Sequence, residues 1–89
     1  MNIEDDDEII KKCLSGDTDS YKILVHKYQG RIINTCYKYT KNILDAEDVA
    51  QEVFFKAYQN LSNFKFDSKF YTWVYRIAVN TSLNYINSK

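Results

Sequence analysis

The chain contains no proline and only two glycines among its 89 residues. The turns that connect strands depend on such residues, so their scarcity argues against a sheet protein. Apolar residues instead recur at three- and four-residue steps, which is typical of helices with one buried face. A chain of this length buries roughly 60–65% of its unfolded surface, enough for one core. The sequence therefore predicts an all-α fold, a compact bundle of about four helices in a single domain over residues 1–89.

The first two helices are expected over about 5–14 and 18–39. Acidic residues at 4–8 suit the positive end of a helix dipole, and the lysines at 11 and 12 suit the negative end. The intervening Ser-Gly-Asp predicts a stop followed by a new cap. The second helix carries one apolar stripe. Its members are Tyr21, Leu24, Val25, Tyr28, Ile32 and Cys36.

The third helix is expected over 46–60, with Asp45 as its N-cap after a loop over 41–44. The fourth is expected to follow a loop over 61–67, to be capped by Asp67 or Ser68, and to end near Asn87. Each carries a core-facing arc. The members are Val49, Ala50, Val53, Phe54, Ala57 and Leu61 in the third, and Phe70, Val74, Ile77, Ala78, Thr81 and Tyr85 in the fourth.

The formal net charge of zero hides an asymmetry along the chain. Residues 1–52 carry 11 acidic against 7 basic residues, a balance of −4, and residues 53–89 carry 1 against 5, a balance of +4. A dipolar chain of this kind presents a cationic face to nucleic acid and an anionic face to another partner.

The stretch from Phe64 to Tyr85 interleaves aromatic rings with cations. Rings and cations together are what unstacked bases and phosphates need. We expect the rings to stack on bases, the cations to hold phosphates, and Asn80 to read base edges because an amide both donates and accepts. The alternative is that the rings are core and the polar groups serve neighbouring side chains. The candidate nucleic-acid contacts are Phe64, Lys65, Phe66, Ser68, Lys69, Tyr71, Thr72, Trp73, Arg76 and Asn80.

The third helix gathers a polar strip opposite its apolar arc. Its members are Asp48, Gln51, Glu52, Phe55 and Gln59. A phenylalanine on a polar face favours a surface for a protein partner over a merely solvated face.

Several classes of function are excluded. No catalytic constellation, phosphate-binding glycine loop or metal-ligand cluster is visible, so neither an enzyme nor a cofactor is expected. Cys13, Cys36 and His26 are too few for a zinc site and predict buried thiols and a structural histidine. The apolar runs are short, so we expect a cytoplasmic protein without membrane insertion.

The segments DAEDVAQEVFFKAYQNLSNF and FYTWVYRIAVNTSLNYI closely resemble conserved region 2 of bacterial sigma factors. The match is to the compact extracytoplasmic-function (ECF) group of the sigma-70 family, and SGDTDSYKILVHKYQ resembles that group's region 2.1. The resemblance implies a helical bundle that docks on the clamp helices of the largest RNA polymerase subunit. It also implies recognition and melting of the promoter −10 element.

The resemblance assigns the polar strip of the third helix to polymerase docking. It assigns the loop over 61–69 and the start of the fourth helix to capture of the non-template strand, with an unstacked base held in a loop pocket. It further implies an anti-sigma factor. Two departures stand out: the family usually has a small residue, often glycine, at the position of Phe66, and the chain stops at Lys89, before the −35-reading region 4.

Two other functions remain open from the sequence. One is a protein-interaction module that binds polymerase or an anti-sigma regulator without reading DNA. The other is general single-strand binding, which predicts no base preference.

Overall fold

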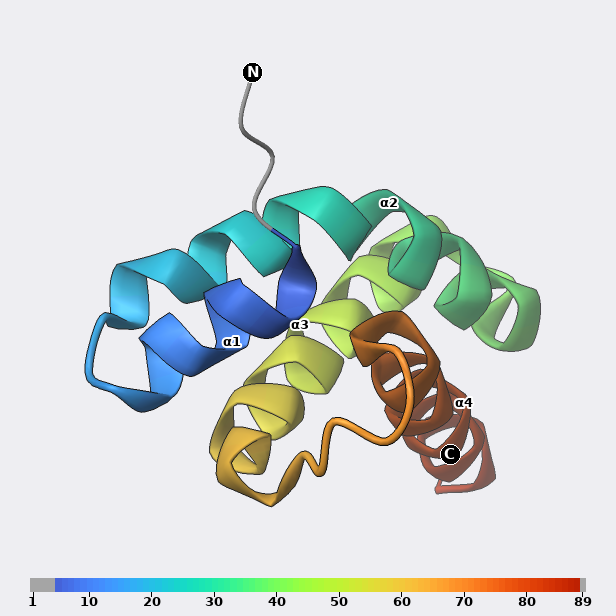
Figure 1. Ribbon diagram of the computed structural model, residues 1–89. Coiled ribbons are helices and arrows are strands. Elements are labelled where there is room, and N and C mark those ends of the chain that lie inside the picture. Colours follow the sequence, from blue (N-terminus) through green and yellow to red (C-terminus); the bar gives the residue numbers. More distant parts are fainter. Residues whose placement is uncertain (1–4, 89) are drawn as a thin grey trace.

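The computed structural model describes residues 5–88 of the chain (Figure 1). It contains four α-helices: α1 (Asp6–Leu14), α2 (Tyr21–Thr40), α3 (Ile43–Gln59) and α4 (Phe70–Asn87). Two single-turn 3-10 helices, η1 (Thr18–Ser20) and η2 (Leu61–Asn63), precede α2 and follow α3. No strand occurs within the described residues. The predicted all-α bundle of about four helices is therefore confirmed.

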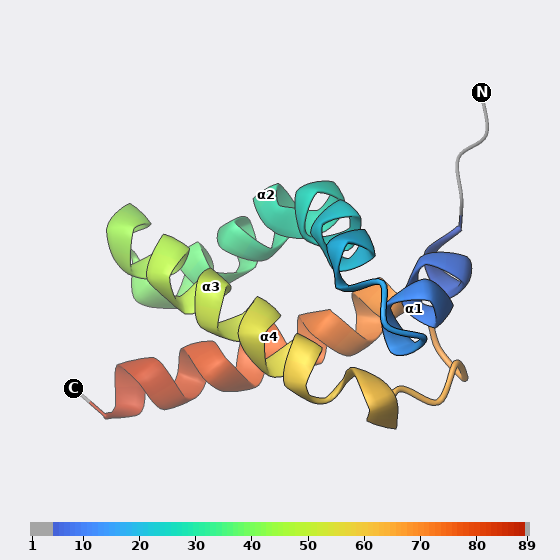
Figure 2. The same cartoon turned by 90° about the vertical axis from the view of Figure 1, so that its left-hand side faces the viewer.

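Helices α2, α3 and α4 pack against one another and enclose the core, while α1 lies against the first half of α2 (Figures 1 and 2). All three predicted apolar arcs face this core. Val25, Ile77 and Tyr85 are only partly buried, because they lie at the edges of their arcs. The helical periodicity therefore located the core correctly.

The caps predicted for α3 and α4 are both wrong. The cap of α1, which was not predicted, is Asp5, which accepts a hydrogen bond from the Glu8 N–H at 2.9 Å. In α3 the cap is Asn42, whose side chain accepts from the Asp45 N–H at 3.0 Å. The helix thus starts at Ile43, inside the predicted loop, because an asparagine three residues upstream performs the role predicted for Asp45.

The α4 cap was predicted at Asp67 or Ser68, and this is also wrong. The cap position is Lys69, whose side chain makes no capping hydrogen bond. The Ser68 hydroxyl instead faces the Lys69 carbonyl at 3.4 Å. The positive end of α4 therefore lacks a side-chain cap from its N-cap residue.

Two tyrosine hydroxyls tie the helices together. Tyr21 donates to the Phe54 carbonyl at 2.6 Å, linking α2 to α3, and burial raises the pKa of Tyr21. Tyr28 donates to the Asp6 carboxylate, linking α2 to the start of α1. Both cysteines are buried free thiols, as predicted, and burial raises the pKa of each.

Candidate nucleic-acid interface and docking surface

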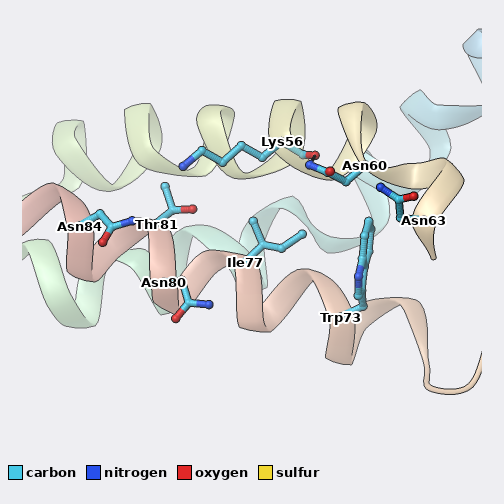
Figure 3. A pocket seen from close by; sticks show the side chains of 8 residues that line it. All are labelled: Lys56, Asn60, Asn63, Trp73, Ile77, Asn80, Thr81 and Asn84. Carbon is cyan, nitrogen blue, oxygen red and sulfur yellow. Dashed lines mark hydrogen bonds between the residues drawn. The ribbon is translucent and has the colours of Figure 1, made fainter. Parts of the chain in front are cut away.

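A groove of about 380 Å³ runs between the C-terminal half of α3 and the middle of α4. Polar side chains from three elements converge on it, with one aromatic ring at the end nearest η2 (Figure 3). The lining residues are Lys56, Asn60, Asn63, Trp73, Ile77, Asn80, Thr81 and Asn84.

Four of the lining side chains are amides, which both donate and accept hydrogen bonds. Asn80 and Asn84 lie one turn apart on α4, and Asn63 belongs to η2. Asn60 donates to the Lys56 carbonyl at 2.9 Å, which fixes its orientation and leaves its own oxygen available as an acceptor. This chemistry matches the mixed donor and acceptor edges of nucleobases.

The Trp73 ring stands at one end of the groove, facing Asn63 (Figure 3). Its centroid lies 5.3 Å from that of Phe64 and 5.9 Å from that of Phe70. Phe64 itself is only 4% exposed. The prediction that Phe64 stacks on a base is therefore corrected: its ring is core, and it holds the half-buried Trp73 in place.

Phe66 adopts a left-handed backbone conformation, with φ of 59°. Its ring is 37% exposed and packs edge-on against Phe64 at 4.9 Å. Side chains other than glycine pay about 1–2 kcal/mol in this region of backbone space. The geometry gives a physical reason for a glycine at this position, which the resemblance to sigma factors implies.

Three of the predicted contacts form an exposed strip on α4. Thr72, Arg76 and Asn80 are all exposed and follow one another at one-turn intervals. Arg76 and Asn80 also line a second hollow of about 390 Å³ together with Tyr75 and Val79. Asn80 thus borders both this hollow and the groove.

The remaining predicted contacts do not all meet at the groove. Lys65 and Lys69 are exposed in the loop before α4, and Ser68 is half-buried there. Tyr71 lies on the α2 side of α4, where its ring packs against Tyr28 at 5.3 Å. Tyr71 was predicted to stack on bases as Trp73 does, but two residues along a helix turn the side chain to nearly the opposite side.

The predicted docking strip lies on the outer face of α3. All five residues (Asp48, Gln51, Glu52, Phe55 and Gln59) are exposed, Phe55 by 61%. A hollow of about 540 Å³ between α2 and α3 adjoins the strip and shares two of its residues, Asp48 and Gln51. The α2 side of this hollow, formed by Val25, Gln29 and Ile33, was not predicted.

Lys56 connects the two faces of α3. Its ammonium group lies 3.6 Å from the Glu52 carboxylate of the docking strip, while its side chain lines the groove. Lys56, Asn60, Asn63 and Asn84 were missed from the sequence. The one-turn spacing within each helix could have been read from the sequence. The packing of α3 against α4, which brings these residues together, could not.

Residues 5–88 contain no group of three or more potential metal ligands. Over the same residues, every helix is too short or too polar to cross a lipid bilayer.

Comparisons with known proteins agree with this geometry. A family model described as Sigma-70 region 2 matches residues 24–89. The chain is 43% identical over 83 residues to the RNA polymerase sigma-H factor of Pseudomonas aeruginosa, covering 93% of this chain and 43% of that protein. It is 41% identical over 80 residues to the ECF RNA polymerase sigma factor SigW of Bacillus subtilis, covering 90% of this chain and 43% of that protein. The chain thus spans less than half the length of these relatives.

A solved structure resembles the whole bundle. It is the NMR structure of an engineered region 2 of sigmaE in complex with GTAAAA, with a TM-score of 0.91 and 37% identity. The alignment covers 99% of this chain and 93% of that chain.

The left-handed backbone at Phe66 generates a stability prediction. We expect Phe66→Gly to be more stable than Phe66→Ala by about 1 kcal/mol, because glycine adopts this conformation without strain. The free energy of unfolding in urea measures the difference. Lys65 is the matched control: its φ is not positive, so alanine should exceed glycine there. The same order of stability at both positions would contradict the strain argument.

Proposed function

The chain belongs to the ECF group of the sigma-70 family, whose region 2 it carries, and we propose that it directs RNA polymerase to promoters by recognising and melting the −10 element. The single observation that carries the proposal is the groove of amides with a tryptophan at its end, built on a fold that matches a region 2 solved with GTAAAA. The whole of residues 1–89 forms this one domain in the proposal.

The groove supports base recognition on the non-template strand. A displaced base placed between α3 and α4 meets the Asn80 amide and the Trp73 ring. Stacking on an aromatic ring contributes about 1–3 kcal/mol per base, and amide bonds to base edges supply the sequence preference. The proposed DNA contacts therefore also include Lys56, Asn60, Asn63 and Asn84. They no longer include Phe64.

The cations supply positioning rather than readout. Lys65, Lys69 and Arg76 are exposed around the start of α4, and α4 itself contains no acidic residue. Phosphate contacts of this kind fix the register of the strand without reading its sequence. Thr72, Ser68 and the Phe66 ring border the same path.

Opening the duplex costs roughly 1.4 kcal/mol of stacking per base-pair step. Capture of unstacked bases by Trp73, and contact with the exposed part of Phe66, offsets this cost in the proposal. In the proposal, Tyr71 adds a ring surface for bases on the other side of α4, where it faces α2.

The docking strip supports contact with the clamp helices of the largest polymerase subunit. Its Asp48 and Glu52 carboxylates are exposed beside Phe55, a combination suited to a cationic partner with an apolar socket. An anti-sigma factor would regulate the protein by covering this strip or the DNA groove. The protein acts in the cytoplasm, where polymerase and promoters are, and carries out no catalysis and needs no cofactor.

The first experiment tests base recognition. Fluorescence anisotropy with labelled GTAAAA, at two salt concentrations, should show salt-sensitive binding that is weaker for a scrambled sequence. Asn80→Ala should reduce the discrimination between the two sequences by about 1–3 kcal/mol, because a base-edge contact is lost. The control is Asn34→Ala, an exposed asparagine on α2.

The outcomes separate the three candidate functions. Equal affinity for both sequences favours general single-strand binding. No DNA affinity, with polymerase binding intact, favours a pure protein-interaction module. Unchanged discrimination in Asn80→Ala removes Asn80 from the reading residues.

The second experiment tests melting. Trp73→Ala should impair opening of a −10 duplex more than binding to a premelted promoter, because the ring is needed as bases unstack. Opening is measured with core polymerase by the fluorescence of 2-aminopurine placed in the −10 element. The premelted promoter controls for any loosening of the fold, so an equal loss on both substrates would argue against a melting role.

The third experiment tests docking. Phe55→Ala should weaken binding to core polymerase by about tenfold or more, since a central aromatic anchor is removed. Biolayer interferometry with immobilised core polymerase measures the change. Ile23→Ala, which trims a side chain 51% exposed on α2 outside the strip, is the control. Equal affinities for the two variants would exclude Phe55 from the interface.

A further inference from the structure

A further hollow, lined by charged residues and of about 540 Å³, lies on the side of α4 opposite the groove. The start of α1, the middle of α2 and the start of α4 meet there (Figures 1 and 2). Its lining pairs three cations with three acids and two tyrosines. The residues are Asp5, Asp6, Asp7, Lys27, Tyr28, Arg31, Lys69, Phe70 and Tyr71.

The Asp6 carboxylate already occupies the hollow as an anion. The Asp6 side chain is only 16% exposed, and one of its carboxylate oxygens lies 2.8 Å from the Lys27 ammonium group. The other oxygen accepts from the Tyr28 hydroxyl. A carboxylate bound by a lysine and a phenol occupies the place that a phosphate oxygen would take.

Two cations of the hollow are not engaged by a carboxylate at ion-pair distance. Within residues 5–88, neither Arg31 nor Lys69 has an ion-pair partner. The Arg31 guanidinium instead lies over the Tyr71 ring, 4.0 Å from its centroid. Stacking of this kind fixes the guanidinium while leaving its N–H edge free to bind an anion bidentately.

The exposed face of α4 connects the hollow to the groove. Asn80, Arg76 and Thr72 lead one turn at a time toward Lys69, which lines the hollow. These three turns cover about 16 Å, a length that a few nucleotides of a displaced strand can span. A strand held at the groove therefore reaches the edge of the hollow along α4, which carries no acidic residue.

We infer that this hollow is a second binding site for the DNA backbone, formed by Lys27, Arg31 and Lys69, and that Asp6 occupies it until a phosphate displaces the carboxylate. The site rests on the proposed function, because its ligand is the strand that the groove holds. The second site adds a DNA contact made by α2. The Asp6 carboxylate of α1 blocks this contact until a phosphate displaces it.

The test uses anisotropy with GTAAAA extended by eight thymidines at either end. Asp6→Asn should raise the affinity by about twofold to fivefold, the worth of one ion pair near the protein surface. It should also steepen the salt slope by about 0.7, the value for one added phosphate contact on a single strand. Asp19→Asn is the control, since it removes the same charge from another lysine–aspartate pair, with Lys22.

The gain must also depend on the proposed cations. The double variant Asp6→Asn/Arg31→Gln should lose the gain in affinity and the steeper slope. If Asp6→Asn behaves like Asp19→Asn, or if the gain survives Arg31→Gln, the inference is overturned. Circular dichroism on each variant reports whether α1 stays folded.

A second variant covers the case in which Asp6→Asn unfolds. Arg31→Gln alone should weaken binding and flatten the salt slope more than Lys22→Gln does; equal effects would overturn the inference. Failure of this site is distinguishable from failure of the proposed function. Sequence-dependent binding of GTAAAA that requires Asn80, with no role for Arg31, removes only the second site, whereas no binding of either oligonucleotide removes both.

Discussion

The structure depends on the burial of α4 against both α2 and α3. Val74 and Ala78 on α4 are fully buried, and small side chains such as Ala78 and Ala57 let the helices approach closely. With its inner arc committed to the core, α4 exposes its outer strip and borders a hollow on each side. The packing therefore creates both the groove and the hollow.

The aromatic residues before and within α4 divide between support and function. Phe64 and Phe70 are buried and hold Trp73, while Tyr71 holds Arg31 in place on the other side of the helix. These three rings thus fix the orientation of Trp73 and Arg31, which are the groups that face solvent. A rigid arrangement limits the conformational entropy that binding would otherwise cost.

The sequence was sufficient to predict the helices, the core and the exposed strip on α3, because periodicity reports which face of a helix is apolar. It was insufficient at Asn42, because several polar residues near a helix start compete for the cap, and at Lys69, because the N-cap residue of α4 makes no side-chain capping bond. It was insufficient at Phe64 because an aromatic beside a helix is equally suited to core and to surface. The members of the groove on α3, such as Asn60, depend on which helices pack together, and periodicity within one helix carries no such information.

Lys56 contacts both the docking strip and the groove, so a partner bound on one face of α3 can affect the other face. The ammonium group that Glu52 attracts is attached to a side chain lining the amide groove. Under the proposed function, a protein that engages the Glu52 carboxylate changes the electrostatic potential in the groove through one lysine side chain. No hinge or domain rotation is required for such communication, because its range is the width of a single helix, about 10–12 Å.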